Sequence, residues 1–203
     1  MERELGAPLD RKLAPWGQLP FIGATDRSVA LELGQGLRYA PGFVLEADEL
    51  LTWLVGDVDW QRPFLARAVA SFGVAYNYSG VSFRDLEMPP AIASLADDVE
   101  ARIGYRPNNC LLNLYETGAS SMGFHADATD RFTRGSGVTI ITLGAARDLV
   151  FRRAEMRREG ASIRLEHGSL LQMSAALQRG WQHAVPRLAA AGPRISVTFR
   201  SLR

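Results

Sequence analysis

The chain of 203 residues contains one cysteine, Cys110, and no run of about 18 apolar residues. A single cysteine excludes an internal disulfide and a zinc module built from several cysteines, and Cys110 lies in an apolar segment typical of a core strand. The first residues, MERELGAPLDRK, carry acids where a signal peptide has basic and then apolar residues. These absences predict a cytoplasmic protein without a membrane partner.

Lysine is also nearly absent, because Lys12 is the only one and arginine supplies the remaining positive charge. Residues 1–100 hold 8 Lys and Arg against 15 Asp and Glu, whereas residues 101–203 hold 15 against 7. A basic half is a general indication of a polyanionic partner such as nucleic acid. Six arginines could follow a phosphate backbone, with a solvated hairpin as the alternative. They are Arg147, Arg152, Arg153, Arg157, Arg158 and Arg164.

What is present is typical of a globular protein, with 47% hydrophobic and 22% charged residues. The length predicts a single domain over residues 26–203, and we expect a monomer. Residues 1–25 are rich in Pro, Gly and polar residues without periodicity. This composition predicts an N-terminal arm, laid over the domain or left loose.

Helical periodicity occurs early in the chain, and strand-like runs occur late. Apolar spacing predicts helices over residues 46–55 and 91–103, the second fixed at its start by Pro89 and Pro90. Short β-rich runs separated by turn residues follow. They cover residues 110–115, 138–143, 149–151, 162–165, 169–173 and 195–199. The pattern predicts an α+β domain with a jelly-roll double sheet and outer helices on its N-terminal side.

Two of the three histidines have surroundings that suit a metal. His125 and Asp127 form an H-x-D motif, whose two side chains project to the same side of an extended segment. His183 lies in the β-rich half and could bring a third ligand from a neighbouring strand. Two histidines and one carboxylate on one face of an ion form the facial triad of Fe(II) oxygenases. An isolated H-x-D is common by chance, so the prediction needs support elsewhere; the remaining histidine, His167, is predicted to be structural.

Two arginines near the end of the sequence provide that support. Arg194 and Arg200 are six residues apart, so they lie on one side of a strand whose other positions are apolar. A guanidinium that points into a β core needs an anionic partner, because an unpaired buried charge is very costly. A dicarboxylate co-substrate would supply that partner, and arginine pairs with planar carboxylates better than lysine does.

Four segments together resemble the AlkB family of Fe(II)/2-oxoglutarate-dependent dioxygenases. They are NNCLLNLYETGASSMGFHADATD, GSGVTIITLGAARDLVFRR, HGSLLQMSAALQRGWQHAVPR and RISVTFR, and the resemblance covers roughly residues 70–203. It implies a double-stranded β-helix fold, which agrees with the jelly roll predicted above. It also implies an enzyme that uses Fe(II), with 2-oxoglutarate and O2 as co-substrates.

The resemblance also assigns roles to individual residues. It implies that His125, Asp127 and His183 bind the catalytic iron. Arg200 would bind the remote carboxylate of 2-oxoglutarate, and Arg194 would lie near the carboxylate closest to the metal. Asn113 and Tyr115 are expected to assist in binding the co-substrate.

The activity implied by the resemblance is oxidative demethylation of N-alkylated bases in DNA or RNA, as in the repair of alkylation damage. Tyr78 stands where a base-stacking residue is expected, with Tyr76 on the same side; cross-strand packing is the alternative for both. Asp130 is the only acidic residue directly after the H-x-D motif, where several repair members read the damaged base with acidic side chains. Arg152 and Arg153 are expected to contact phosphates.

Two other functions are compatible with these residues. The same oxygenase core could act on a protein, a lipid or a small metabolite, because a fold does not determine a substrate. The chain could also be a non-catalytic nucleic-acid-binding domain that has kept the fold. The second reading is disfavoured because both arginines and all three expected metal ligands are present.

Overall fold

Two antiparallel sheets form the body of the protein in the computed structural model, which describes residues 15–22, 27–76, 80–156 and 159–203. The five-stranded sheet has the order β1-β9-β8-β11-β6. These strands are β1 (Phe21–Ile22), β9 (Glu159–Leu165), β8 (Arg147–Arg153), β11 (Trp181–Val185) and β6 (Met122–His125). The seven-stranded sheet has the order β2-β10-β7-β12-β5-β4-β3. Its strands are β2 (Leu37–Ala40), β10 (Ser169–Ser174), β7 (Gly137–Gly144), β12 (Arg194–Arg200), β5 (Asn109–Tyr115), β4 (Arg67–Gly73) and β3 (Gln61–Phe64).

Strand β12 shows how alternation divides the side chains between two layers. Ile195, Val197 and Phe199 belong to the apolar cluster that the large sheet forms with its outer helices. The residues between them face the small sheet, because successive side chains of a strand point to opposite faces. Arg194 and Arg200 both lie on this second side and are almost fully buried. The prediction that the two arginines share one side of the last strand is confirmed.

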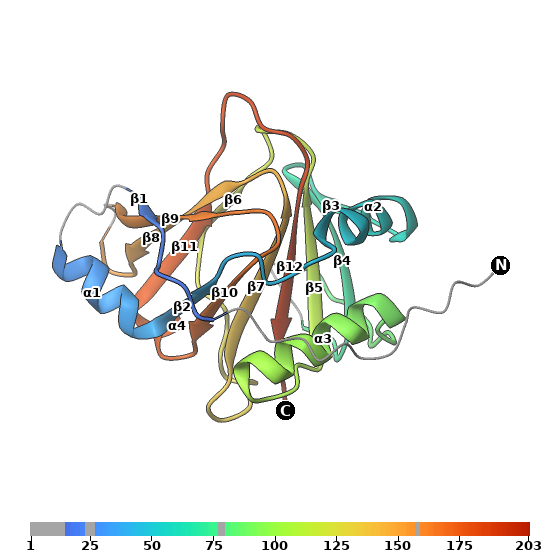
Figure 1. Cartoon of the computed structure of the whole chain (residues 1–203), viewed down its shortest axis with the longest axis horizontal. Helices are drawn as coiled ribbons and strands as arrows, with labels where there is room; N and C mark the ends of the chain where they lie inside the picture. Colours follow the sequence, from blue (N-terminus) through green and yellow to red (C-terminus); the bar gives the residue numbers. More distant parts are fainter. Residues whose placement is uncertain (1–14, 23–26, 77–79, 157–158) are drawn as a thin grey trace.

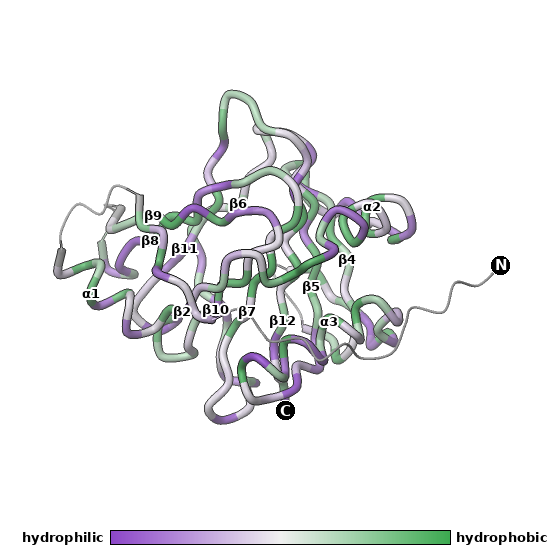
Figure 2. Tube along the Cα trace, in the orientation of Figure 1, coloured by the Kyte–Doolittle hydropathy of each residue, from purple (hydrophilic) through white to green (hydrophobic). Residues whose placement is uncertain are grey.

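Helices α2 (Ala47–Asp57) and α3 (Pro90–Ile103) cover the outer face of the seven-stranded sheet (Figure 1). Helix α3 begins with a proline in its first turn and ends at Gly104, whose φ of 87° is the left-handed conformation common after a helix. Its apolar stripe packs on the sheet through buried residues such as Ile92, Leu95 and Val99. Figure 2 shows that α3 contains both hydrophilic and hydrophobic residues, as expected of a helix with one face on the sheet and one in solvent.

The remaining helices lie beside the small sheet. Helix α1 (Arg27–Gly36) contacts β9, and the short α4 (Leu177–Gly180) leads directly into β11. Strand β1 pairs with β9, with Phe21 opposite Ile163, so residues 21–22 of the predicted arm form part of the sheet. Within the described residues, no helix combines the length and the apolar character needed to cross a bilayer.

The double antiparallel sheet with outer helices confirms the predicted jelly-roll architecture. Both predicted helices and all six predicted strands are present, with ends that differ by a few residues. The sequence did not predict α1, β1, β3, β4 and α4, and it gave no bounds for β6 and β11, the strands of the two histidines. Most of these are short, or lie at sheet edges where half-buried residues give weak alternation.

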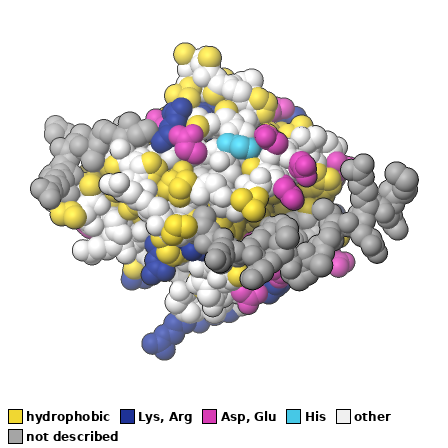
Figure 3. Space-filling view, viewed as in Figure 1, with side chains coloured by type: hydrophobic (Ala, Val, Ile, Leu, Met, Phe, Trp, Pro, Cys, Tyr) yellow, Lys and Arg dark blue, Asp and Glu magenta, His cyan; other side chains and the backbone are white. Residues whose placement is uncertain are grey.

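The face drawn in Figure 3 is of mixed charge, with acidic side chains near its middle and basic ones at its margins. The basic residues of β8 and β9 do not form a continuous run of free cations either. Arg164 pairs with Asp148 at 2.9 Å, and Arg147 is only 1% exposed. The prediction that Arg147 follows a phosphate backbone is therefore wrong, because a phosphate cannot reach it.

Candidate active site

A small cavity of about 30 Å³ lies between the two sheets. Its lining combines apolar walls with a few convergent polar groups, as in most small-molecule sites. The polar lining residues come from β5, β6, β11 and β12 and from the segment after β6. They are Asn113, Tyr115, His125, Asp127, His183, Arg194, Ser196, Thr198 and Arg200. All seven residues predicted to bind iron or 2-oxoglutarate are among them.

Two histidines meet at the wall formed by the small sheet. His125 ends β6 and is the register partner of His183 in β11, and their ring centroids are 4.3 Å apart. His125 Nδ1 lies 2.9 Å from the Gly123 carbonyl, so Nδ1 carries the proton and Nε2 the lone pair. Burial lowers the pKa of His125, and burial lowers that of His183 to about 3. Both imidazoles are therefore neutral at pH 7, which is the form that binds metals.

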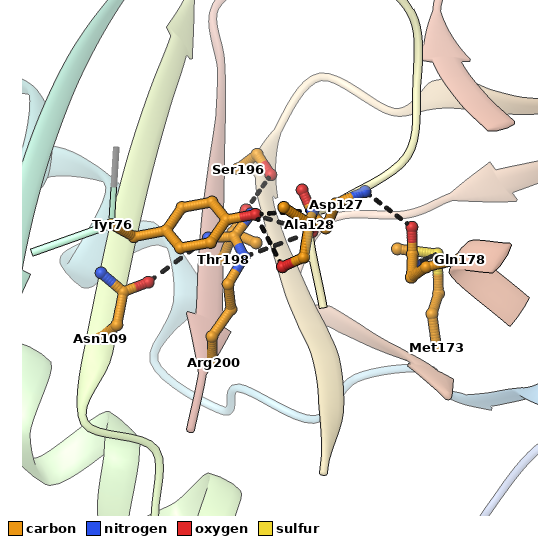
Figure 4. Close-up of polar contacts among 9 residues, drawn as sticks. All are labelled: Tyr76, Asn109, Asp127, Ala128, Met173, Gln178, Ser196, Thr198 and Arg200. Atoms are coloured by element: carbon orange, nitrogen blue, oxygen red, sulfur yellow. Dashed lines mark hydrogen bonds and ion pairs between the residues drawn. The ribbon is translucent and has the colours of Figure 1, made fainter. Parts of the chain in front are cut away.

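Asp127 follows β6 and is held by contacts from distant segments (Figure 4). Its Oδ2 accepts hydrogen bonds from Arg200 Nε at 3.2 Å and Nη2 at 3.0 Å. Its backbone N–H donates to Gln178 Oε1 at 3.0 Å, while Oδ1 is buried without a hydrogen-bond partner. Burial alone would raise the pKa of Asp127, but the attraction of Arg200 outweighs it and the pKa lies below its ordinary value. The side chain is thus a carboxylate with one unused oxygen.

Further contacts fix Arg200 and the backbone beside Asp127 (Figure 4). Asn109 Oδ1 accepts a hydrogen bond from Arg200 Nη1 at 3.4 Å, and the guanidinium lies 4.4 Å from the centroid of the Tyr76 ring. The Tyr76 hydroxyl accepts from the Ala128 N–H at 2.9 Å and donates to the Ala128 carbonyl at 3.3 Å. Tyr76 is 5% exposed, which argues against the expectation that it stacks on a base. Its ring covers the arginine that holds Asp127.

The opposite end of β12 has a different environment. Arg194 is 1% exposed, donates from Nη2 to Thr142 Oγ1 at 3.1 Å, and lies 5.1 Å from the Tyr115 ring centroid. Its Nε and Nη1 are buried, and no described residue forms a hydrogen bond with either. Burial lowers the pKa of this guanidinium. Arg200 pairs with Asp127, whereas no carboxylate among the described residues pairs with Arg194.

Asn113 lies on β5 between these two ends. Its Oδ1 accepts a hydrogen bond from Arg67 Nε at 2.9 Å, and Arg67 packs on the ring of Phe64 at 4.4 Å. Because the carbonyl oxygen is engaged, the NH2 group is the end of the amide that can donate to a ligand in the cavity. The contacts argue against the expectation that Arg200 binds the remote carboxylate, because Arg200 already pairs with Asp127.

The side chains of His125, His183 and Asp127 are of the types that bind Fe(II), although the three are not close enough to form a complete metal site. Within the described ranges, no three His, Cys, Asp or Glu side chains already meet as a complete metal site. The rings of His125 and His183 are in contact. Asp127 Oδ1 accepts no hydrogen bond from the described residues, so it is available to bind a metal. Two neutral imidazoles and one carboxylate are the ligands of the facial triad, so these residues fit Fe(II).

The described residues that are predicted to bind the nucleic acid do not line the cavity. Arg152 donates from Nε and Nη2 to Gln182 Oε1 and lies 4.1 Å from the Phe124 ring centroid. Arg153 instead forms an ion pair with Glu32 of α1, which argues against a phosphate contact. Asp130 is exposed, and Tyr78 lies outside the described residues.

Several residues around the site were not found from the sequence. Gln178 and Asn109 act on Asp127 and Arg200 from other segments, and neither belongs to a recognisable motif. Arg67 could have been noticed, because it is a charged residue that opens the apolar run AVASF. The predicted structural role of His167 agrees with its contacts: Nδ1 accepts from the Gly144 N–H at 2.7 Å, and Nε2 lies 3.3 Å from Asp48.

Comparison with known proteins identifies the family. The family model of the 2OG-Fe(II) oxygenase superfamily matches residues 52–200. The chain belongs to this superfamily. The oxygenase is 30% identical to the protein named DNA oxidative demethylase ALKBH2 of Bos taurus over 216 residues, which cover 95% of this chain and 77% of that protein. It is also 30% identical over 187 residues to alpha-ketoglutarate-dependent dioxygenase alkB homolog 3 of Homo sapiens, covering 80% and 64% of the two chains.

Solved structures support the fold of the oxygenase. The structure of OsALKBH1 matches with a TM-score of 0.62 at 16% identity, over 82% of this chain and 98% of that one. A 2OG-Fe(II) oxygenase family oxidoreductase from Burkholderia pseudomallei matches with a TM-score of 0.55, also at 16% identity, over 85% and 87%. At this identity the likeness concerns the fold alone.

The predicted membership of the AlkB family is confirmed by these relatives. The oxygenase is an oxidoreductase that uses Fe(II), with 2-oxoglutarate and O2 as co-substrates, as predicted. The alternative of a non-catalytic domain is therefore wrong.

Proposed function

We propose that this oxygenase removes methyl groups from N-alkylated bases of nucleic acid by oxidative demethylation. The observation that carries the proposal is the similarity to DNA oxidative demethylase ALKBH2 over 95% of the chain, with all predicted iron and co-substrate residues around one cavity. In the balanced reaction, N–CH3, O2 and 2-oxoglutarate give N–H, formaldehyde, succinate and CO2. The Fe(II) ion and 2-oxoglutarate supply the oxidising power, and the protein supplies binding and orientation.

His125, Asp127 and His183 would hold the iron. The contact of His125 with the Gly123 carbonyl fixes its tautomer, so that Nε2 is presented to the metal. Arg200 occupies one oxygen of Asp127 and leaves Oδ1 for the metal. Gln178 fixes the backbone of the same residue from α4, the helix that leads into the strand of His183.

Arg194 would bind the remote carboxylate of 2-oxoglutarate, with Tyr115 and Asn113 beside it. Its Nε and Nη1 have no hydrogen-bond partner among the described residues, so this guanidinium still has N–H groups that can donate to a carboxylate. This assignment reverses the roles that the resemblance gave to the two arginines. Apolar lining residues, among them Leu111, Ile140 and Leu149, exclude water from the space between the two ends.

Arg152 is the residue that we propose for contact with the phosphate backbone. It lies on the outer side of β8, and its partners Phe124 and Gln182 directly precede His125 and His183 in the chain. The contact would thus be made on the strands that hold the iron ligands. Tyr78 as a base-stacking residue and Asp130 as a base-reading residue remain proposals from the sequence.

The test is formaldehyde release from N-methylated oligonucleotides, measured with unmethylated oligonucleotides of the same sequence as controls. Single and double strands of DNA and RNA are compared in parallel. The proposal expects formaldehyde and succinate in equal amounts with the methylated substrates alone. Turnover of 2-oxoglutarate that no oligonucleotide changes, without formaldehyde, would contradict it and favour a protein, lipid or metabolite substrate.

The phosphate contact has its own test in the salt dependence of oligonucleotide binding. Removing one phosphate contact lowers the slope of log K against log salt by about 0.9 on duplex DNA and about 0.7 on a single strand. We expect this change for Arg152→Gln and none for Arg153→Gln, because Glu32 already neutralises Arg153. Equal slopes for the two variants would remove Arg152 from the interface.

A further inference from the structure

A second buried arginine lies at the end of the cavity where Arg194 stands. Arg147 begins β8 and is 1% exposed. Its Nη2 donates to the Ser120 carbonyl at 3.0 Å and to the Pro186 carbonyl, and Nη1 donates to the Thr117 carbonyl at 3.4 Å. Its Nε is buried without a hydrogen-bond partner. The guanidinium is thus bound by neutral carbonyl groups.

The topology brings Arg147 and Arg194 to the same end of the sheets. Arg194 is the register partner of Tyr115 in β5 and of Gly144 in β7, and Gly144 is three residues before Arg147. The Tyr115 ring centroid lies 5.1 Å from the Arg194 guanidinium and 5.9 Å from that of Arg147. One aromatic ring therefore contacts both cations.

Among the described residues, no carboxylate hydrogen-bonds to either guanidinium. The nearest candidate in the chain, Asp148, is engaged by Arg164. Two buried charges of the same sign repel each other, and burial without a counterion is costly for each. This region of the protein is therefore short of negative charge until a ligand supplies it.

We propose that Arg147 is a specificity-determining residue, whose charge adds to that of Arg194 and makes the Arg194 end of the cavity select a co-substrate with a second carboxylate. The inference rests on the proposed role of Arg194 as the carboxylate anchor. Arg147 does not line the cavity, so it acts on the ligand through space and through Tyr115. In a buried region the screening by water is weak, and such an effect extends beyond contact distance.

Arg147 also joins three loops through its carbonyl contacts, and a purely structural role must be separated from a charge effect. Two probes do so. One is 2-oxoglutarate, and the other is 2-oxopentanoate, which has the same chain length and the same 2-oxo acid group but a methyl group in place of the second carboxylate. Only a charge effect at the Arg194 end of the cavity changes the ratio of the two affinities.

The experiment measures binding of both acids by calorimetry, with Mn(II) in place of Fe(II) so that no turnover occurs. Arg147→Gln should weaken 2-oxoglutarate binding about tenfold and change 2-oxopentanoate binding by less than about threefold. Arg147→Lys keeps the charge, and should keep the ratio of the two affinities within about threefold of the wild type even if the melting temperature falls.

Matched variants complete the design. Arg187→Gln removes an exposed cation directly after Pro186, a partner of Arg147, and should leave the ratio unchanged, because water screens it. Arg194→Gln should lower the ratio more than any change at Arg147. An unaltered ratio in Arg194→Gln would refute the proposed anchor. A lowered ratio in Arg194→Gln together with an unaltered one in Arg147→Gln would refute the present inference alone. If Arg147→Gln fails to fold, loss of the ratio in Arg147→Lys refutes the charge effect.

Discussion

The two ends of strand β12 carry the same residue type on the same side, yet their surroundings differ. Arg200 pairs with Asp127, contacts Asn109 and is covered by the Tyr76 ring. Arg194 has a threonine hydroxyl and an aromatic ring beside it, and two of its nitrogens have no partner. The first guanidinium is neutralised by the protein, whereas the second is not.

The two arginines therefore have different roles, which the sequence motif does not distinguish: one orients a protein carboxylate and the other can bind an anion. A buried cation with its own carboxylate stabilises and orients that carboxylate, because removing either partner leaves an unpaired buried charge. A buried cation without one is suited to bind an anion from solution. The motif with two arginines six residues apart therefore combines one positioning residue with one binding residue.

The largest effect is expected when Asp127, the carboxylate that neutralises Arg200, is replaced. Asp127→Asn keeps the shape of the side chain, but it removes the only anionic ligand and leaves Arg200 without its counterion. We expect the affinity for Mn(II) to fall more than about 100-fold, beyond the loss typical of an outer-shell partner. Metal titration under anaerobic conditions measures this, and near wild-type affinity would exclude Asp127 from the ligands.

The next largest effects are expected when Arg194 and Arg200 are each replaced by lysine. Arg194→Lys keeps the charge and loses the planar fork, so the Kd for 2-oxoglutarate should rise about 10- to 100-fold with little change in metal affinity. Arg200→Lys should do the opposite and act mainly on metal affinity, since its partner is Asp127. Binding isotherms of both variants, for the metal and then for 2-oxoglutarate, decide between the ends. A larger 2-oxoglutarate effect at Arg200 would restore the roles that the resemblance implied.

A smaller effect is expected at Gln178, which acts on the Asp127 end from outside the cavity. Gln178→Leu leaves the buried Asp127 N–H without its acceptor, and the metal affinity should fall about tenfold. Gln172→Leu is the matched control, because Gln172 has only a long contact of 3.5 Å with the Tyr105 hydroxyl. Equal metal affinities in the two variants would show that the backbone contact does not position the ligand.

The smallest effect is expected for Tyr76→Phe, which keeps the ring over Arg200 and loses the hydroxyl. The two contacts with Ala128 disappear, and the free energy of unfolding should fall by about 0.5–1.5 kcal/mol. Denaturant titration measures the change, while oligonucleotide affinity should stay constant. Weaker binding of the oligonucleotide at unchanged stability would return Tyr76 to the substrate interface.

The sequence was sufficient where strong periodicity or a specific motif was present. The apolar runs of β5, β7 and β12 predicted central strands, and alternation in β12 predicted two arginines on one side. The H-x-D motif and the distal His183 pointed to one site, and both line the cavity. In these cases local pattern and tertiary structure agree.

The remainder depended on contacts between segments that no local pattern encodes. The sequence cannot show that Gln178 reaches Asp127 across 51 positions, or that Glu32 of α1 neutralises Arg153. The same holds for Arg147, which counts as one more basic residue in the sequence and is a buried one in the fold. The sequence gives the number of charged residues, whereas the burial and the partners of each residue decide its role.

The register of β12 limits which insertions and deletions this strand can accept. Arg194 and Arg200 are both paired on either side, with β5 and with β7, so the strand cannot slide to absorb a change in length. Inserting or deleting one residue between them would turn one arginine toward the helices on the outer face. Relatives should therefore differ in the residue types between the two arginines, while the number of residues between them stays the same.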